Sequence, residues 1–361
     1  MSLPPTDGML PAIIAKIEAG QRIDGKEFLC LAEKASLNQL GFLAHGVRMR
    51  LHPEPMVTYV IDRNINYTDI CISACKFCAF FKAPEEDGGG VLTKAELAQK
   101  IAETQALGGT QILLQGGLHP DLPLDFYEDM LRFMKATGIH IHGFSPPEIV
   151  HFAKLSGQSI ATVIQRLMAA GLDSIPGGGA EILSNRVRRE LAPNKCDADQ
   201  WIEVMVTAHA LGLRTTATMM FGHIETMAER LEHLQRVRDL QDKTGGFTAF
   251  IPWPFQPDHT PLAAARTIDK TTAVSYLRML ALSRIFLDNV RNIQASWVTQ
   301  GPKIAQLSLF FGANDFGSTM IEENVVAAAG VHFRLSEEEI RRLVTDAGFR
   351  PQQRLMDYTP V

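Results

Sequence analysis

The sequence predicts an α/β protein built as a (β/α)8 barrel of the TIM type, with a helical extension at its N-terminus. From about residue 56, eight short apolar strands alternate with longer amphipathic helices, which is typical of a parallel sheet. About 250 to 300 residues is also the usual length of such a barrel. Glycines, acids and histidines concentrate directly after the strands, at the end where barrels place their functional loops. A doubly wound open sheet is the structural alternative.

The first part of the chain predicts helices. Ile13, Ile14 and Ile17 share one helical face, and Gly20 ends that helix. Gly25 begins a second helix, and we expect a third over residues 36–47. The chain therefore divides into three predicted parts: a helical extension (1–50), the barrel (51–335), and a C-terminal helix and tail that pack on the barrel (336–361).

The barrel elements follow from apolar runs and from helix caps. The predicted strands cover residues 57–62, 111–115, 140–144, 173–176, 214–220, 247–252, 293–296 and 307–311. Thr93 and Glu96 form a capping box before a helix that ends at Gly108. Further helices are predicted after Asp197, over 231–241, over 272–290, and after the capping box of Ser336 and Glu339.

Composition excludes several classes of protein. The chain has 361 residues, 46% hydrophobic and 21% charged, with a net charge of −5, so nothing draws it to nucleic acid or to an anionic membrane. It holds no apolar run of about 18 residues, so we expect no membrane span. Residues 1–8 lack the basic region and apolar core of a secretory signal. We therefore expect a cytoplasmic protein in a reducing compartment.

Three of the five cysteines lie within eight residues, as Cys71, Cys75 and Cys78. This C-x3-C-x2-C spacing can hold three irons of a [4Fe–4S] cluster. Electron-transfer clusters usually have four cysteines, so the open fourth iron indicates a position where another molecule binds. A zinc site lacks a fourth ligand at the usual spacing, and a disulfide framework does not suit five cysteines in so long a chain. A cluster of buried cysteines is the remaining structural alternative.

These cysteines, with Phe77 before the third, resemble the signature of the radical S-adenosylmethionine (SAM) enzymes. Residues 64–68, 176–183 and 244–247 resemble one group of that family, which contains the two radical SAM enzymes of the futalosine route to menaquinone and the deazaflavin-forming synthase. The resemblance covers residues 40–309. Within the group, four stretches are most similar to the cyclic dehypoxanthine futalosine synthases: 114–120, 142–148, 215–223 and 251–257.

The resemblance implies a radical SAM barrel, a [4Fe–4S] cluster on Cys71, Cys75 and Cys78, and SAM bound at the open iron. One electron, from a donor such as flavodoxin or ferredoxin, cleaves SAM to a 5′-deoxyadenosyl radical. That radical removes hydrogen from the ribose of dehypoxanthine futalosine, and the sugar radical closes a spiro ring on the benzoate. Loss of an electron and a proton then gives cyclic dehypoxanthine futalosine.

The resemblance also implies which residues contact the cofactor: Phe77, Phe80, Gln115, Gly116, Gly117, Glu181 and Arg188. The usual acid after the two glycines is absent, because Leu118 and His119 follow them. Simple structural roles are the alternatives: core packing for Phe77, a helix N-terminal acid for Glu181, and a solvated helix arginine for Arg188.

The final step needs a proton acceptor, for which a group with a near-neutral pKa is suited. The candidates are His119, His142, His223 and Glu148, each with a purely structural hydrogen-bonding role as its alternative. Trp253 and Phe255 are candidate walls for the benzoate. The alternative functions are aminofutalosine synthase, a deazaflavin (FO) synthase subunit, an iron–sulfur electron carrier and a zinc-stabilised binding protein.

Overall fold

The computed structural model describes residues 8–361. Its main sheet has seven strands in the order of the sequence, and every neighbouring pair is parallel. The strands are β2 (Asp62–Asn66), β3 (Gln111–Gln115), β4 (His140–Gly143), β5 (Ser174–Ile175), β6 (Arg214–Phe221), β7 (Phe247–Pro254) and β8 (Asn292–Ile293). The predicted parallel α/β barrel is confirmed.

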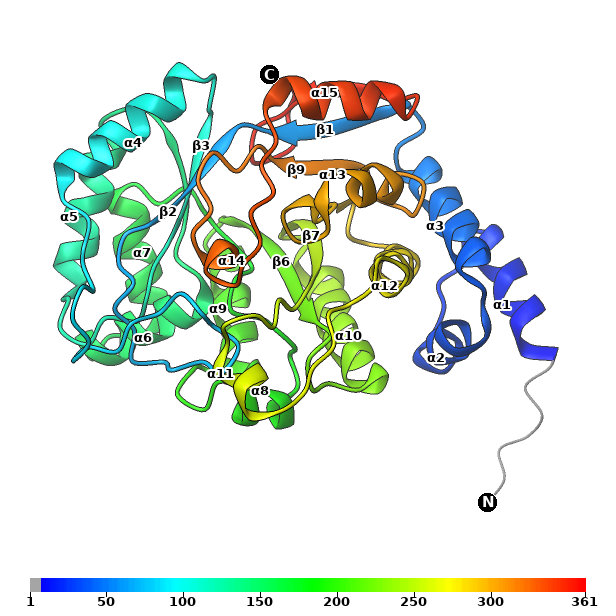
Figure 1. Cartoon of the computed structure of the whole chain (residues 1–361), viewed down its shortest axis with the longest axis horizontal. Helices are drawn as coiled ribbons and strands as arrows, with labels where there is room; N and C mark the ends of the chain where they lie inside the picture. The colour runs from blue at the N-terminus through cyan, green and yellow to red at the C-terminus, as the bar shows by residue number, and fades with distance from the viewer. Residues whose placement is uncertain (1–7) are drawn as a thin grey trace.

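Helices cover the outside of this sheet (Figure 1). They are α4 (Lys94–Ala106), α5 (Leu124–Lys135), α6 (Pro146–Ser156), α7 (Ile160–Ala170), α9 (Ala198–Ala210), α10 (Met227–Thr244), α12 (Ala273–Phe286) and α13 (Trp297–Ser308). Two short helices, α8 (Asn185–Leu191) and α11 (Pro261–Ala265), lie at the end of the barrel where the strands end (Figure 1). The predicted caps are confirmed, because Thr93 and Glu96 form a capping box before α4 and Asp197 caps α9.

A second, three-stranded sheet completes the barrel. It consists of β1 (Met56–Val60), β9 (Asp315–Ser318) and β10 (Arg350–Gln353), in the order β10-β1-β9. Gln294, directly after β8, forms a parallel bridge with Asp315. On the other side, the amide of Ile321 donates to the carbonyl of Asp62 at 3.1 Å. Strand β9 therefore stands between β8 and β2, in the position of the eighth barrel strand.

The prediction of the eighth strand at 307–311 is wrong. Those residues are the end of α13 and the turn after it, where the Ser308 hydroxyl donates to the Ile304 carbonyl one turn back. The actual strand, β9, has the sequence Asp-Phe-Gly-Ser and carries no apolar run. Its Asp315 is buried because Arg354, 39 residues later, pairs with it, and no local pattern reports such a partner. The predicted strand at 57–62 is also divided between β1 and β2.

The three predicted N-terminal helices are confirmed as α1 (Met9–Glu18), α2 (Gly25–Lys34) and α3 (Leu37–Leu51). Helix α3 packs against α12, and Arg278 of α12 donates to the carbonyls of Ala32 and Ala35 at 2.7 and 2.9 Å. These contacts fix the extension to the barrel wall. Most of the segment for which we predict no secretory signal lies outside the described residues. Within residues 8–361, no helix has the length and apolarity needed to cross a membrane.

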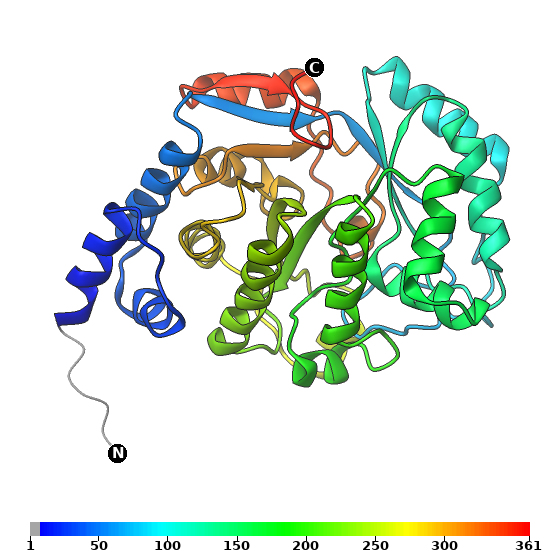
Figure 2. The same ribbon diagram turned by 180° about the vertical axis from the view of Figure 1, so that it is seen from behind.

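The last residues of the chain lie at the end of the barrel where the strands begin, because residues 355–357 line a hollow there with His140 and Arg214. Helix α14 (Val325–Ala328) follows β9, and α15 (Glu337–Asp346) starts at the predicted capping box of Ser336 and Glu339. Strand β10 then pairs with β1. Seen from either side, the red C-terminal segment lies next to the blue strand β1 (Figures 1 and 2). The exact three-part division of the chain stays a prediction.

Candidate active site

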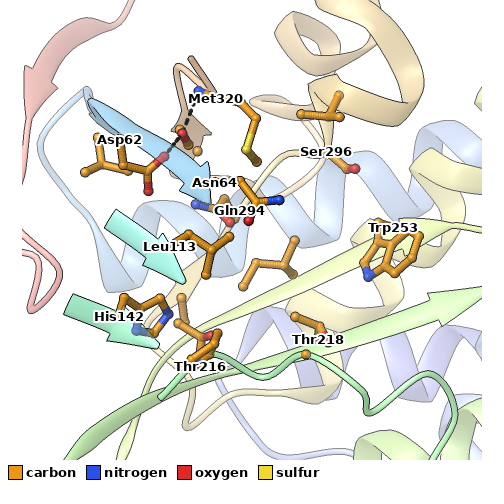
Figure 3. A pocket seen from close by; sticks show the side chains of 18 of the residues that line it. Asp62, Asn64, Leu113, His142, Thr216, Thr218, Trp253, Gln294, Ser296 and Met320 are labelled. Atoms are coloured by element: carbon orange, nitrogen blue, oxygen red, sulfur yellow. Dashed lines mark hydrogen bonds between the residues drawn. The ribbon is translucent and has the colours of Figure 1, made fainter. Parts of the chain in front are cut away.

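A cavity of about 300 Å³ occupies the inside of the barrel. Inward-facing side chains of β2, β3, β4, β6 and β7 line it, together with residues after β8 and β9 and three residues of the C-terminal tail. Figure 3 shows Asp62 and Asn64 reaching in from β2, His142 from β4 and Trp253 from β7. The cavity therefore extends from one end of the barrel to the other, and some of the residues predicted to be functional line it.

The cysteine loop follows β2 and lies at the end of the barrel where the strands end. Its centre is fixed by backbone hydrogen bonds on both sides of Lys76. The Lys76 amide donates to the Leu191 carbonyl of α8 at 2.8 Å, and the Leu262 amide of α11 donates to the Lys76 carbonyl at 2.7 Å. The loop is therefore held in place by elements far from it in the sequence.

The three thiols have surroundings that suit a cluster. The amides of Leu118 and Ser73 donate to Cys71 Sγ at 3.2 and 3.4 Å, and Ser73 Oγ lies 3.1 Å from Cys75 Sγ. Hydrogen bonds to ligand sulfurs tune iron–sulfur clusters. Within residues 8–361, no three His, Cys, Asp or Glu side chains converge as they would around a single ion. In a [4Fe–4S] cluster each cysteine binds a different iron, and three thiols on one constrained loop fit that role.

Burial shapes the acidity of these thiols. It raises the pKa of Cys75 to about 11 and raises that of Cys78, while the nearby Lys195 ammonium acts in the opposite direction. The thiol forms are therefore favoured until a metal displaces the proton.

The Gly116–Gly117 turn supports the cysteine loop. The Gly117 amide donates to the Thr68 carbonyl at 2.9 Å, and a Cβ on Gly117 would lie only 2.1 Å from the Ile70 carbonyl oxygen. The close backbone approach at this turn is therefore to the protein's own chain, and contact of Gly116 and Gly117 with SAM stays a prediction. Neither glycine lines the cavity, whereas Gln115 does.

We expect Gly117→Ala to displace this turn and the cysteine loop with it. Overpacking of this kind lowers the free energy of unfolding by about 1–3 kcal/mol, measured by urea denaturation, and we expect less iron per chain after anaerobic reconstitution. Gly90→Ala is the matched control, because a Cβ on Gly90 meets no atom within 4 Å. Equal iron content in the two variants would contradict the role of this turn in supporting the cysteine loop.

Glu181 lines the cavity near the cysteine loop. Its backbone has a φ of +39°, which is strained for a residue with a side chain. Its Oε1 accepts from Lys195 Nζ at 2.8 Å, whereas its buried Oε2 has no hydrogen-bond partner within residues 8–361. Lys195 also lies 5.2 Å above the Phe77 ring. One oxygen of Glu181 is thus hydrogen-bonded to Lys195, and the other lies 3.6 Å from the Arg188 guanidinium without a hydrogen bond of its own. Sequence reasoning missed Lys195, because a single lysine before Cys196 belongs to no motif.

Two other predicted cofactor residues lie away from the cavity. Arg188 is buried and donates to the carbonyls of Gly179 and Ala180 at 3.0 and 2.7 Å, so it holds the glycine-rich loop before Glu181. Phe80 lines a separate hollow, together with Tyr67 and Leu92. Their direct contact with SAM stays a prediction.

Of the four candidate bases, His142 alone is among the residues that line the cavity. Burial lowers its pKa to about 3, so its imidazole is neutral, and its Nδ1 lies 2.7 Å from Ser174 Oγ. His119 Nδ1 accepts from the Asp121 amide, and His223 pairs with Glu225 at 2.8 Å. The structure therefore places one candidate base, His142, at the cavity. The other two histidines contact neighbouring residues of their own loops.

Glu148 is fully buried, and burial raises its pKa. It accepts hydrogen bonds from Tyr67, Ser145 and the Gly116 amide. With Ser145 it forms the capping box of α6. This S-x-x-E signal is visible in the sequence, and it accounts for the residue without a catalytic role.

The end of the cavity opposite the cysteines carries polar residues that sequence reasoning left without a role. Asp62, Asn64 and Gln111 reach in from β2 and β3, and Arg354 from the tail. A signal for the first two was present, because Asp62, Asn64 and Asn66 alternate with other residues at the period of a strand. No local signal places Arg354 there.

The buried histidines make stability dependent on pH, and His142 is the example inside the site. The unfolded chain binds a proton at His142 below its ordinary pKa of 6.5, whereas the folded protein does so only near 3. The free energy of unfolding therefore falls as the pH is lowered from 6.5, and this group has no effect above 6.5. Because His142→Gln removes this contribution, we expect its unfolding free energy to change less between pH 6.5 and 4, by up to about 1.4 kcal/mol per pH unit. If the unfolding free energies of the variant and the wild type, measured with urea, fell equally with pH, His142 would not be a neutral, buried group.

Comparison with known proteins agrees with this geometry. Residues 65–237 match the family model of the Radical SAM superfamily, and residues 244–361 match the CofH/MqnC C-terminal region. The fold resembles the crystal structure of methylornithine synthase (PylB), with a TM-score of 0.73, 17% identity, and coverage of 94% of this chain and 97% of that one.

Two curated relatives are much more similar in sequence. The cyclic dehypoxanthine futalosine synthase of Halalkalibacterium halodurans is 45% identical, over 97% of this chain and 94% of the relative. The 5-amino-6-(D-ribitylamino)uracil--L-tyrosine 4-hydroxyphenyl transferase of Methanopyrus kandleri is 42% identical, over 88% of each chain. The chain is therefore a radical SAM enzyme, with a [4Fe–4S] cluster and SAM as its cofactors. Within that superfamily it belongs to the family that carries the CofH/MqnC C-terminal region.

Proposed function

We propose that this enzyme converts dehypoxanthine futalosine into cyclic dehypoxanthine futalosine in menaquinone biosynthesis. The observation that carries the proposal is the 45% identity to the Halalkalibacterium halodurans synthase over nearly the whole of both chains. The barrel cavity supports it, because apolar walls from Leu113, Ile251 and Trp253 stand beside polar groups, as a substrate with a benzoate and a sugar requires.

Cys71, Cys75 and Cys78 hold the cluster, which with SAM supplies the carbon radical that removes a hydrogen atom from the substrate. Glu181 offers its Oε2, which has no hydrogen bond within residues 8–361, to the amine or the ribose of SAM, and Lys195 and Arg188 keep the Glu181 carboxylate in place. Gln115 lines the same part of the cavity, next to Gly178. The chain thus binds and orients, while the cofactor supplies the reactive chemistry.

His142 is the base that the geometry favours. It is neutral, it lines the cavity, and Ser174 fixes its ring. With a pKa of about 3 it is a weak base, which suffices because a proton lost to restore an aromatic ring is strongly acidic. A reducing protein such as flavodoxin or ferredoxin supplies the electron, and we place the enzyme in the cytoplasm.

The test is turnover by the anaerobically reconstituted, reduced enzyme with SAM and dehypoxanthine futalosine. We expect 5′-deoxyadenosine and the cyclised product, identified by mass spectrometry, in equal amounts. If neither forms, the proposal fails.

A second candidate is the reaction named for the Methanopyrus kandleri relative, which is nearly as similar. The same assay with tyrosine and 5-amino-6-(D-ribitylamino)uracil distinguishes the two. 5′-Deoxyadenosine and coupled product from that pair alone would assign the second reaction.

A further inference from the structure

One end of the cavity carries buried polar atoms that the protein leaves unpaired. We call this end, lined by Asp62, Asn64, Gln111 and Arg354, the polar chamber. Asn64 and Gln111 are each 5% exposed, and neither Asn64 Oδ1 nor Gln111 Oε1 has a hydrogen-bond partner within residues 8–361. A buried polar group without a hydrogen bond lowers the stability of the folded protein. Two such atoms in one cavity are the expected mark of a ligand site.

The chamber lies at the end of the cavity away from the cysteines. Asp62 and Gln111 are register partners at the first positions of β2 and β3, whereas the cysteine loop follows the last residue of β2. In Figure 3, Asp62 and Trp253 lie on opposite sides of the cavity. A ligand group in the chamber is therefore separate from the part of the cavity next to Glu181.

Charge decides which ligand group fits the chamber. The Arg354 guanidinium is already engaged, since it donates to both oxygens of Asp315, at 2.5 and 3.1 Å, and to the Leu355 carbonyl. Asp62 adds a second carboxylate, which accepts from Gln111 Nε2 at 2.7 Å and from Ser318. A substrate carboxylate would thus meet Asp62 and an arginine that Asp315 already occupies, so the chamber does not suit the benzoate anion.

Hydroxyl groups fit the chamber instead. The unpaired atoms of Asn64 and Gln111 are amide oxygens, which need donors, and a hydroxyl both donates and accepts. Beyond the chamber, the cavity walls are apolar, with Leu113 on β3 and Ile251 on β7. This neighbouring part of the cavity suits an aryl ring rather than a sugar.

We propose that the polar chamber binds the sugar hydroxyls of the substrate, with the side-chain oxygens of Asn64 and Gln111 as acceptors. This inference rests on the proposed function. The reacting sugar carbon then faces the end that carries Glu181, and the aryl ring lies beside the sugar, against Leu113 and Ile251. Asn64 and Gln111 are specificity-determining residues for a polyhydroxylated substrate.

The test is Asn64→Leu, a change of similar size that removes an unpaired amide. We expect opposite effects on stability and on binding. The substrate-free variant should melt at a higher temperature than the wild type, because a buried unpaired group is gone. Its affinity for dehypoxanthine futalosine should fall about tenfold. Affinity is measured by calorimetry on the reconstituted enzyme with 5′-deoxyadenosine and methionine in place of SAM, which prevents turnover.

The 2-deoxy and 3-deoxy sugar analogues of the substrate, each of which lacks one hydroxyl, complete a double-mutant cycle with Asn64→Leu. If Asn64 accepts a sugar hydroxyl, the variant and the wild type bind one of these analogues equally well. Tyr127→Phe is the matched control, since it removes another unpaired buried oxygen, that of Tyr127, outside the cavity lining; it should leave every affinity unchanged.

Two results would overturn the inference. If Asn64→Leu loses the same affinity for the substrate and for both deoxy analogues, the hydroxyl assignment is wrong and the proposed function stands. If the wild type binds neither the substrate nor its analogues, the proposed function fails and the inference fails with it.

Discussion

Cys75→Ala abolishes both the cluster and the formation of 5′-deoxyadenosine. Cys75 is the middle cysteine of the loop and its side chain is buried, 6% exposed, so no solvent ligand replaces the lost sulfur. The two remaining cysteines leave a second iron without a protein ligand. We expect the reconstituted variant to contain little iron and sulfide, and to give no 5′-deoxyadenosine above the level of a reaction without enzyme.

Cys30→Ala is the control for this change. Cys30 is also a buried, free cysteine, but it lies in α2, away from the cysteine loop. It should keep full cluster content and full turnover. Circular dichroism of the Cys75 variant should match the wild type, because the loop is held by backbone hydrogen bonds of Lys76. Retained SAM cleavage in Cys75→Ala would remove the assignment of the cluster to this loop.

The parts of the fold that depend on local signals follow from the sequence. Capping boxes such as Thr93 with Glu96 and Ser336 with Glu339 place helix starts, because the cap and its partner are three residues apart. The cysteine spacing identifies the cluster loop for the same reason. The strand β3 has the apolar run Ile-Leu-Leu that the core requires, and it lies at the predicted position.

The parts that depend on distant partners do not follow from the sequence. Strand β9 is polar, and it is a strand because it fills the gap between β8 and β2. Lys195 meets Glu181, 14 residues earlier, only in the folded chain, and the amide oxygens of Asn64 and Gln111 become buried and unpaired only once the barrel closes around them. Sequence patterns record burial and spacing, whereas these residues act through contacts that only the folded chain makes.

The second large effect concerns the C-terminal tail. We expect Arg354→Met to destabilise the protein by about 3–5 kcal/mol, because removing one partner of a buried ion pair leaves the other charge unpaired. Arg354 is 4% exposed, and its partner Asp315 is fully buried. The midpoint of urea unfolding measures the effect.

Two further variants separate the charge from the size of the side chain. Asp315→Asn combined with Arg354→Met removes both charges, so the double variant should be more stable than Arg354→Met alone, since breaking the pair costs more than replacing it. Arg350→Met removes an exposed pair with Glu54 from the same strand, 3.0 Å apart, and should change stability little. If Arg354→Met lowered stability as little as Arg350→Met, the charge of Arg354 would not be what fixes the tail to the barrel. A double variant less stable than Arg354→Met would mean that Asp315 supports β9 mainly through its bonds to Gln294 and to the Gly317 amide.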